Sequence, residues 1–319
     1  MSDFALLACQ ALFACVLLLA AAGRLGRAGK YFELASHFRV QYLVASSAGL
    51  LVFIVTRQWT WAAAALLYAA LETASVLPYY LSPQRRVAVA ATPRRKLRVL
   101  LANVNYHNPD LSPLIELAHS ARPDILIVQE ATDEWCAGLK VLRATFPHEV
   151  LVPRPRGAGI ALFSRLPLAN PKIIFDGENQ RPGIVTRLDL GGGHTLTLLT
   201  MHTHAPIRRR HFGYRNALLS EAASLVPKLP RPLVVVGDLN TTPWSPHFSL
   251  LLRAGNLREA RLGFGLLPTW PVWLRFALLM IPIDHCLLSP EVETLAIKAG
   301  PDIGSDHLPV LFELSCAVS

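Results

Sequence analysis

Val234-Val235-Val236-Gly237-Asp238-Leu239-Asn240 is an apolar, β-branched run that predicts a buried strand ending at Asp238. Loop residues follow it directly. Asp238 and Asn240 lie two residues apart, so both side chains can belong to one strand end. A carboxylate and an amide are costly to bury at the mouth of such a strand. They therefore indicate a functional site, and the alternative interpretation is an Asx-type turn after the strand.

Polar side chains stand at the ends of other predicted strands as well. Glu130 follows a short apolar strand at 124–129, and Asp284-His285 begins a strand at 283–288. Ser305-Asp306-His307 precedes a strand at 308–314. Strands and helices alternate up to residue 145 and strands dominate after it, which predicts a layered α/β domain with helices outside its sheets.

The acidic residues favour a hard metal ion over zinc. The chain has five cysteines, without a CxxC pair or a set of paired histidine ligands. Mg²⁺ prefers oxygen ligands and takes one or two carboxylates. Glu130 is the leading candidate ligand, with Asn103 at the end of the strand 97–103 supporting it through its amide. The alternative for Glu130 is a solvated helix-capping acid.

The remaining strand-end residues suit the hydrolysis of a phosphoester. Asp238 can orient and deprotonate a water, and Asn240 can donate its amide hydrogens to a phosphoryl oxygen. His307 can be held charged or oriented as a base by Asp284. His285, in the same strand start, is assigned a structural role.

A histidine and arginine segment follows the predicted strand 194–201. His202 and His204 lie on one face of that segment, and His202, nearer the strand end, is preferred for protonating a leaving group or stabilising the transition state. Arg208 and Arg215 are candidate phosphate-binding residues. The alternatives are a solvated turn for the histidines and a solvated basic face for the arginines, among them Arg209 and Arg210.

The first 83 residues are strongly apolar. Segments 4–23, 42–56 and 59–81 approach the roughly 20 residues that cross a bilayer. We expect about three membrane helices, with a two-helix hairpin or buried core helices as alternatives. Lys and Arg in the first connection and after the third segment place the following domain in the cytoplasm. The expected location is the cell (inner) membrane, multi-pass, with a basic linker at 84–96.

Residues 262–283 are also apolar, with tryptophans at 270 and 273. Prolines and Arg275 interrupt this run, so a hydrophobic loop touching the bilayer surface is favoured over a fourth span. The net charge of +9, most of it after residue 83, favours anionic partners: nucleic acid, acidic lipid headgroups or phosphorylated small molecules. The odd, widely spaced cysteines suit a reducing compartment.

Taken in order, these segments resemble the endonuclease/exonuclease/phosphatase superfamily over residues 97–315. The matching pieces are Leu100-Leu101-Ala102-Asn103, Ile127-Val128-Gln129-Glu130, Gly159-Ile160-Ala161-Leu162-Phe163-Ser164-Arg165, the strand end at His202, Gly237-Asp238-Leu239-Asn240, Ile283-Asp284-His285 and Gly304-Ser305-Asp306-His307. With its N-terminal helices, the chain looks like the membrane-anchored bacterial branch of that family.

The resemblance implies a DNase I-like, four-layered α/β sandwich over residues 97–319, after a transmembrane region at 1–83, and dependence on Mg²⁺ or Mn²⁺. Carried over by position, Glu130 binds metal with Asn103 and Asp306 beside it. Asp238 positions water, Asn240 contacts phosphate, and His307 with Asp284 serves as base or phosphate stabiliser; His202 matches the family's other active-site histidine. The predicted protein is a membrane-anchored phosphoester hydrolase, a phosphodiesterase, nuclease or phosphatase; the alternative is a catalytically inactive, membrane-tethered binding module of the same fold.

Overall fold

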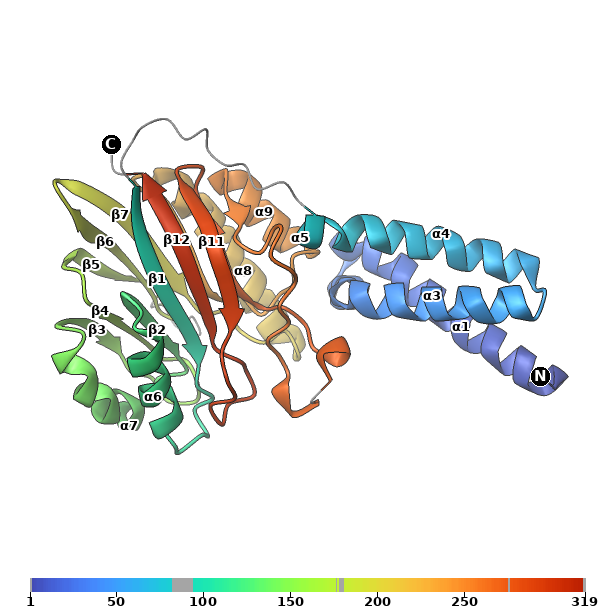
Figure 1. Ribbon diagram of the computed structural model, residues 1–319, viewed down its shortest axis with the longest axis horizontal. Helices are drawn as coiled ribbons and strands as arrows, with labels where there is room; N and C mark the ends of the chain where they lie inside the picture. The colour runs from blue at the N-terminus through green and yellow to red at the C-terminus, as the bar shows by residue number, and fades with distance from the viewer. Residues whose placement is uncertain (1, 82–93, 176, 178–180, 275, 318–319) are drawn as a thin grey trace.

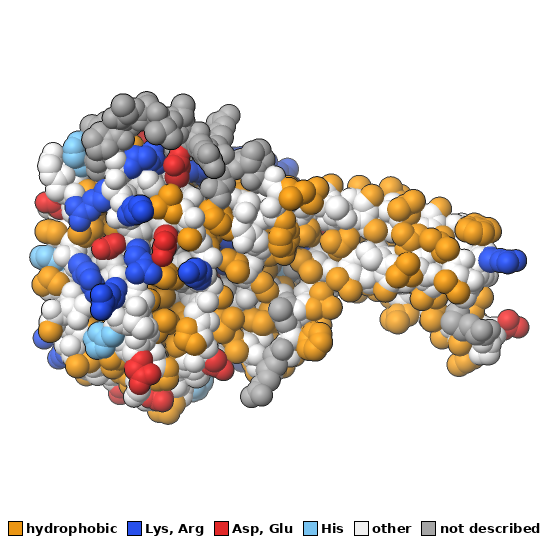
Figure 2. Space-filling model, in the orientation of Figure 1, with side chains coloured by type: hydrophobic (Ala, Val, Ile, Leu, Met, Phe, Trp, Pro, Cys, Tyr) orange, Lys and Arg blue, Asp and Glu red, His pale blue; other side chains and the backbone are white. Residues whose placement is uncertain are grey.

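The computed structural model of the protein describes residues 2–81, 94–175, 177, 181–274 and 276–317. A rod of helices from the N-terminal residues extends from one side of a two-sheet domain (Figure 1). Hydrophobic side chains cover most of the rod, whereas charged side chains gather on the domain (Figure 2). The apolar and charged parts of the sequence therefore form separate parts of the molecule.

Two six-stranded sheets form the domain. The first has the order β11-β12-β1-β2-β4-β3 and the second β5-β6-β7-β8-β10-β9. The strands of the first sheet are β1 (Arg94–Asn103), β2 (Ile125–Gln129), β3 (His148–Val152), β4 (Ile160–Ser164), β11 (Val292–Ala299) and β12 (Val310–Ala317). Those of the second are β5 (Leu168–Ile174), β6 (Gly183–Gly191), β7 (His194–Met201), β8 (Leu233–Asp238), β9 (Arg258–Glu259) and β10 (Asp284–Leu288). The pairs β1–β2 and β7–β8 are parallel, and the other pairs are antiparallel.

Helices cover the outer face of each sheet, which gives four layers (Figure 1). Side chains of both sheets form one core between them, including Leu101, Ile127 and Val236. A second cluster packs the first sheet against α6 (Ser112–Ala121), α7 (Asp133–Gly138) and the 3₁₀ segment η3 (Leu139–Ala144). A third packs the second sheet against α8 (Arg209–Leu225), η4 (Val226–Lys228) and α9 (Pro246–Gly255). The predicted four-layered α/β sandwich is confirmed, because each sheet is apolar on both faces.

The N-terminal residues form a helical region. Its elements are α1 (Asp3–Arg24), η1 (Gly26–Ala28), α2 (Lys30–Ala35), η2 (Ser36–Phe38), α3 (Arg39–Val55), α4 (Trp59–Val76) and α5 (Pro78–Leu81). Phe13, Phe53 and Trp61 pack together where α1, α3 and α4 meet. Glu72 of α4 is completely buried and paired with Arg39 at 3.0 Å and with Arg24 at 2.9 Å.

Two helical segments of this region are long and apolar enough to cross a membrane, by length and composition: Asp3–Arg24 and Lys30–Val55. The third predicted span falls on α4, whose 18 residues do not qualify on the same criterion. Helices thus form at all three predicted places, and two of them are candidate spans.

The structure corrects several sequence boundaries. Arg94, Arg95 and Lys96 belong to β1, not to the predicted linker, whose earlier residues lie outside the described part of the chain. β5 and β9 were not predicted: β5 contains a proline and mostly exposed side chains, and β9 has two residues. The described residues of the apolar segment 262–283 form a loop with two 3₁₀ segments, η5 (Val272–Leu274) and η6 (Ala277–Leu279), as favoured over a fourth span.

Candidate active site

Strand pairing brings the predicted polar residues to one edge of the sandwich. The parallel pair β1–β2 ends with Asn103 opposite Gln129, so Glu130 follows at the same edge. In the second sheet, Asp238 at the end of β8 lies directly opposite Asp284 at the start of β10. Residues that are 46 positions apart in sequence number therefore face each other because an antiparallel pair has a fixed register.

Gln129 joins the two sheets beneath this edge. Its side chain is completely buried; it accepts a hydrogen bond from the Asp238 backbone N–H at 2.8 Å and donates one to the Met201 carbonyl at 2.8 Å. Gly237 lets the backbones of β7 and β8 lie close together here, since a Cβ atom at this position would lie 1.8 Å from the Met201 carbonyl oxygen. Gln129 lies in the Ile127-Val128-Gln129-Glu130 segment, where its neutral side chain gave no sign of a role of its own.

Asp238 is the centre of the polar cluster. Its Oδ2 lies 3.2 Å from Asn103 Nδ2, 3.1 Å from Asn240 Nδ2 and 3.4 Å from His202 Nε2. The Asn240 backbone N–H donates to the other carboxylate oxygen at 2.8 Å. Burial of the carboxyl group, together with the nearby Asp284, raises the pKa of Asp238 to about 7 against the opposing influence of His307. A carboxyl group with this pKa suits a general base near neutral pH.

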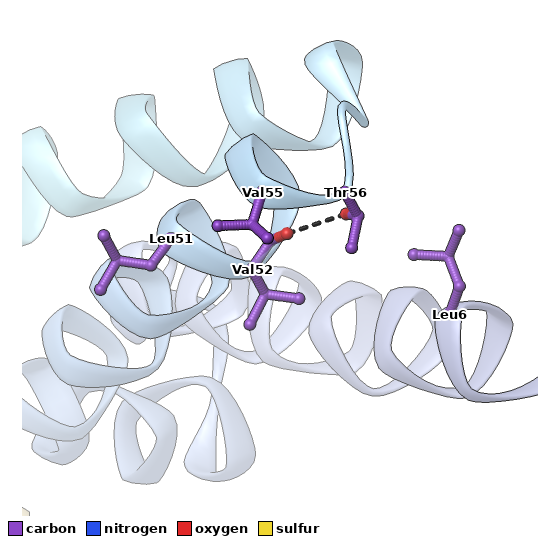
Figure 3. Close-up of a pocket in the computed structure, with 5 residues that line it drawn as sticks. All are labelled: Leu6, Leu51, Val52, Val55 and Thr56. Atoms are coloured by element: carbon purple, nitrogen blue, oxygen red, sulfur yellow. Dashed lines mark hydrogen bonds between the residues drawn. The ribbon is translucent and has the colours of Figure 1, made fainter. Parts of the chain in front are cut away.

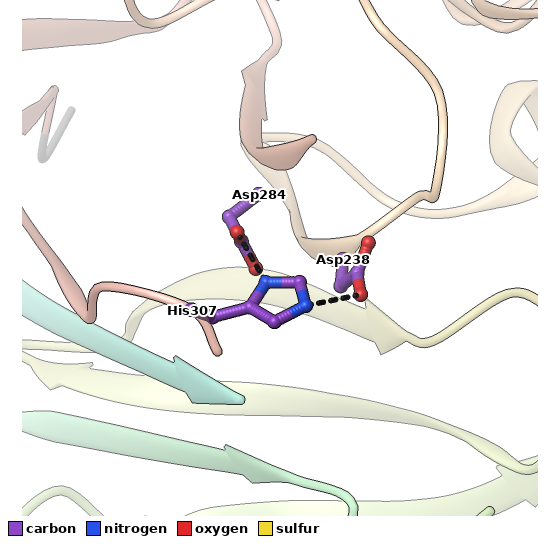
Figure 4. Close-up of side chains that lie close together, drawn as sticks. All are labelled: Asp238, Asp284 and His307. Carbon is purple, nitrogen blue, oxygen red and sulfur yellow. Dashed lines mark hydrogen bonds and ion pairs between the residues drawn. The ribbon is translucent and has the colours of Figure 1, made fainter. Parts of the chain in front are cut away.

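His307 and Asp284 form an oriented pair beside Asp238 (Figure 4). His307 Nδ1 lies 2.9 Å from Asp284 Oδ2, and its Nε2 points toward Asp238 Oδ2 at 3.7 Å. Burial alone would lower the pKa of His307, but Asp284, Asp238 and Asp306 outweigh it and raise that pKa to about 10. Although burial opposes ionisation of Asp284 too, His307 lowers the pKa of that acid. The pair therefore presents a protonated imidazole edge to the cluster.

Glu130 offers oxygen atoms of the kind a hard cation prefers. Its Oε2 accepts the Tyr106 backbone N–H at 3.1 Å, and its Oε1 lies 3.4 Å from Asn103 Nδ2. Glu130 has a left-handed backbone with φ of 65°, which is uncommon for a residue other than glycine and concentrates at functional sites. Asp306 stands at the same rim, with Oδ2 accepting from Trp270 Nε1 at 3.0 Å. The carboxylates of Glu130 and Asp306 fit Mg²⁺ or Mn²⁺. Asn103 beside them turns its amide N–H group toward Glu130, and its Oδ1 accepts the Asn105 backbone N–H at 3.1 Å.

A second group of atoms has ligand-like spacing. One oxygen each of Asp238 and Asp284 and one nitrogen of His307 lie within 4.8 Å of one another. In this group His307 Nδ1 is bonded to Asp284 Oδ2 at 2.9 Å, and its Nε2 faces Asp238 Oδ2 at 3.7 Å. The described residues therefore offer two sets of ligand atoms for a cation, this group and Glu130 with its neighbours.

His202 also contacts Asp238, and it lies next to Arg181, a residue that no sequence pattern indicated. Arg181 Nη1 lies 2.7 and 3.0 Å from the two ring nitrogens of His202 and donates to the Gly157 carbonyl. Burial and the Arg181 charge hold the pKa of His202 well below its usual range, so this ring is neutral. Arg181 thus supplies fixed positive charge at the site. The only local signal was one arginine in a polar loop.

The two predicted phosphate-binding arginines lie in different surroundings. Arg208 is exposed at the N-cap of α8. Arg215 is completely buried, and its Nη1 donates to the Asn240 carbonyl at 3.1 Å, so direct contact with a substrate does not agree with its position. His204 stacks near His211 and Tyr214, and the buried His285 bonds Glu259 and the Thr241 carbonyl, consistent with its structural assignment.

A hollow of about 630 Å³ lies far from this cluster, on the helical region (Figure 3). It is lined by Leu6, Leu51, Val52, Val55 and Thr56, and the Thr56 hydroxyl donates to the Val52 carbonyl. Its lining is almost wholly aliphatic. We therefore assign it to the packing of the helices and not to the chemistry.

Comparison with known proteins identifies the class. The endonuclease/exonuclease/phosphatase family matches residues 100–307, which span the domain from β1 to His307, and the chain belongs to this family. Members of the family hydrolyse phosphoesters and typically depend on divalent metal ions. A search of curated proteins finds no match to the chain.

Solved structures share the fold at low sequence identity. The human Nocturnin catalytic domain, solved with bound sulfate, has a TM-score of 0.57 at 18% identity, covering 71% of this chain and 98% of that one. The 3′-5′ exonuclease NExo of Neisseria meningitidis has a TM-score of 0.56 at 19% identity, covering 68% and 98%. D. rerio TDP2 complexed with single-strand DNA product has a TM-score of 0.55 at 16% identity, and the match covers 69% of this chain and 98% of that one.

Proposed function

We propose that this protein is a membrane-anchored, divalent-metal-dependent phosphoester hydrolase. One observation carries the proposal: Asp238, with a pKa raised to about 7, lies within hydrogen-bonding reach of Asn103 and Asn240 and 3.7 Å from the Asp284-oriented His307. This arrangement combines a base, amide donors and a positive charge, which are the groups that in-line attack of water on phosphorus needs.

Each residue has a defined task in this mechanism. Asp238 accepts the proton of the attacking water. Asn240, whose amide is 3.1 Å from Asp238, orients that water or the phosphoryl oxygen. The protonated edge of His307 and the guanidinium of Arg181 balance charge that develops on the phosphoryl oxygens. The neutral His202 donates a hydrogen bond there, and exposed Arg208 attracts the anionic substrate from outside.

Glu130, Asn103 and Asp306 would hold Mg²⁺ or Mn²⁺, which supplies a Lewis acid for the phosphoryl oxygen. We assign these three residues from the donor chemistry described above. Removal of the cation is expected to abolish turnover while leaving the fold, because the domain core is formed by the two sheets.

The substrate is proposed to lie at a membrane surface. Trp273, Phe276 and Leu279 are exposed on the loop between β9 and β10. Gln41 of the candidate span Lys30–Val55 donates to the Leu278 carbonyl of this loop at 2.7 Å. At its start, Trp270 bonds the metal-site residue Asp306. The loop, here called the apolar lip (residues 270–282), thus connects a candidate span to the active site.

The first test is a substrate panel with the purified full chain in detergent and in vesicles. Single-stranded DNA, abasic DNA, phosphoinositides and sphingomyelin are each incubated with Mg²⁺ and with chelator. We expect Mg²⁺-dependent release of product, fastest from a lipid substrate in vesicles. Faster turnover of DNA would replace the lipid assignment with a nuclease. Metal binding without turnover across the panel would favour the inactive binding module.

A further inference from the structure

A buried ion pair joins the helical region to the catalytic domain. Glu33 of α2 and Arg215 of α8 are both completely buried, and their carboxylate and guanidinium approach to 3.0 Å. Desolvating two charges is costly, so a buried pair is weak support for stability. The pair does, however, fix the positions of the two side chains, because a buried charged group must keep its partner.

The same two side chains hold the loop that follows Asp238. Arg215 Nη1 donates to the Asn240 carbonyl at 3.1 Å, while its Nη2 and Nε bond Asn216 Oδ1 at 2.7 and 2.9 Å. Thr241 Oγ1 donates to Glu33 Oε1 at 3.4 Å. The Glu33–Arg215 pair therefore reaches two successive residues of the active-site loop.

His37, one helical turn after Glu33, reaches the next residue. Its Nδ1 lies 2.8 Å from Thr242 Oγ1, and its Nε2 lies 3.5 Å from Glu33 Oε2. Asn240, Thr241 and Thr242 are thus each contacted by a buried side chain of this cluster. Two of the three contacting side chains belong to the helical region and not to the catalytic domain.

This loop sets the direction of the Asn240 amide. Asn240 has a left-handed backbone with φ of 45°, and its Nδ2 lies 3.1 Å from Asp238 Oδ2 and 3.5 Å from His202 Nε2. The Asn240 amide also donates to the Thr203 carbonyl at 3.0 Å, and the bond from Arg215 to the Asn240 carbonyl fixes the backbone from which this amide projects. Misplacement of a reacting group by about 1 Å can lower a rate by roughly 100-fold.

We propose that the helical region is a working part of the active site, and that Glu33 and Arg215 are positioning residues that hold the Asn240 loop in its catalytic geometry. This inference rests on the proposed hydrolase function. It explains why an arginine on α8 is buried behind the site, where a substrate does not reach it.

A second link runs from α5 through Glu259. Tyr79 of α5 donates to Glu259 at 3.1 Å, and Glu259 pairs with Arg261 at 3.0 Å. Arg261 in turn donates to the carbonyl of Asp284. The helical region therefore reaches both the residue that orients His307 and the loop that carries Asn240.

Kinetics of the full chain test the proposal. Glu33→Gln keeps the volume of the side chain but removes its charge. Arg215→Lys keeps a charge but not the forked set of donors. We expect either change to lower kcat about 10- to 100-fold with KM altered less than threefold, since the loop orients the reaction and does not bind the substrate from outside. In the double variant the two losses are expected to be far less than multiplicative.

Glu149→Gln is the matched control, because it breaks an exposed pair with Arg143 on the first sheet, away from the site. It should leave kcat unchanged. Hydrogen–deuterium exchange of peptides covering 239–245 is the second readout. We expect faster exchange there in Glu33→Gln and in Arg215→Lys, and wild-type exchange in the control.

The outcomes separate the two proposals. Absence of turnover by the wild-type chain on every substrate would refute the hydrolase function, and the exchange measurement would still report on the loop. Wild-type kcat and wild-type exchange in both variants would overturn the positioning role. If one of the two variants fails to fold, the kcat and exchange of the other variant test the positioning role.

Discussion

Asp238 shows how burial produces a reactive group. Desolvation raises the pKa of its carboxyl group, whereas the neighbouring histidine and backbone N–H stabilise the charged form. The result is a group near its titration midpoint at neutral pH. The same carboxyl group in water would be fully ionised and a weaker base.

Replacement of this carboxylate should separate chemistry from folding. Asp238→Asn is expected to lower kcat by about 10²–10⁴-fold, because general-base catalysis is lost while the amide keeps the shape of the side chain. His307→Ala should likewise remove activity. Steady-state kinetics and a thermal unfolding curve measure both effects. Activity that persists in clean preparations of both folded variants would refute these roles.

Glu130→Gln should affect the metal requirement first. The amide keeps one oxygen but loses the negative charge, so we expect at least a 10-fold rise in the Mg²⁺ concentration that gives half-maximal activity. Titration of chelator-treated protein with Mg²⁺ measures this. Glu116→Gln, on the exposed face of α6, is the control and should not shift the titration. If Glu130→Gln needs the same Mg²⁺ concentration as the wild type, other residues bind the cation.

Glu259 should make stability depend on pH. Burial opposes its ionisation, but His285 and Arg261 outweigh burial and lower the pKa of Glu259 from its ordinary value of 4.5. The stability that this charge contributes is therefore fully present above pH 4.5 and is lost as pH falls through the lower folded-state pKa. Glu259→Gln should cost about 3–5 kcal/mol at pH 7 because it leaves Arg261 buried without its partner.

Chemical denaturation at several pH values checks this. The difference between wild type and Glu259→Gln should narrow below pH 4.5, because Glu259 takes up a proton first in the unfolded chain and then, at lower pH, in the folded protein. A difference that stays constant down to pH 3 would contradict the assigned cause.

The candidate site residues could be proposed from the sequence because they lie next to recognisable strands. Glu130, Asp238 and His307 each stand beside an apolar run, and strand ends meet at sheet edges. Arg181 lies in a loop without periodicity, so no pattern marked it. The burial of Arg215 could not be predicted either, since its partner Glu33 is far away in the chain and only the tertiary fold joins them.

Among the elements, strands of the core were predictable and edge strands were not. β8 is buried along its whole length and β2 likewise, which produces the continuous apolar runs seen in the sequence. β5 is mostly exposed and has a register shift between Ala169 and Lys172, so it lacks that signal. Helix α4 was predicted to be a membrane span and is not a candidate span. Glu72 and the aromatic residues at its N-terminus lower its mean hydropathy.

The apolar lip is the element whose role is most directly testable. Trp273→Ser combined with Phe276→Ser should lower the rate on a phosphoester in vesicles about 5- to 50-fold, because two exposed aromatic side chains no longer enter the bilayer interface. The rate on a water-soluble phosphodiester should be unchanged. Val141→Ser, another exposed apolar residue, serves as the control. Equal loss on both substrates would show that the lip supports the site and not the membrane contact.

At the scale of the whole molecule, the charged domain and the apolar rod (Figure 2) predict that the rod lies in a membrane and that the domain lies on one fixed side of it. The chain should remain in the membrane fraction after an alkaline carbonate wash. A fluorescent protein fused at the C-terminus should be bright, and an exported phosphatase fused there should be inactive, if the domain lies in the cytoplasm. The reverse pattern would place the domain outside, and release by carbonate would refute the anchor.

The Glu33–Arg215 pair also limits how this protein can be rebuilt. A chimera that joins the two-sheet domain to a foreign anchor would leave a guanidinium without a counter-ion deep in a dry interface. Such a graft would need a substituted Arg215 or a transplanted acid. The boundary between the helical region and the two-sheet domain is therefore not a convenient place to cut. A shortened version of the protein should keep α2 and replace exposed apolar side chains of α1 and α3 instead.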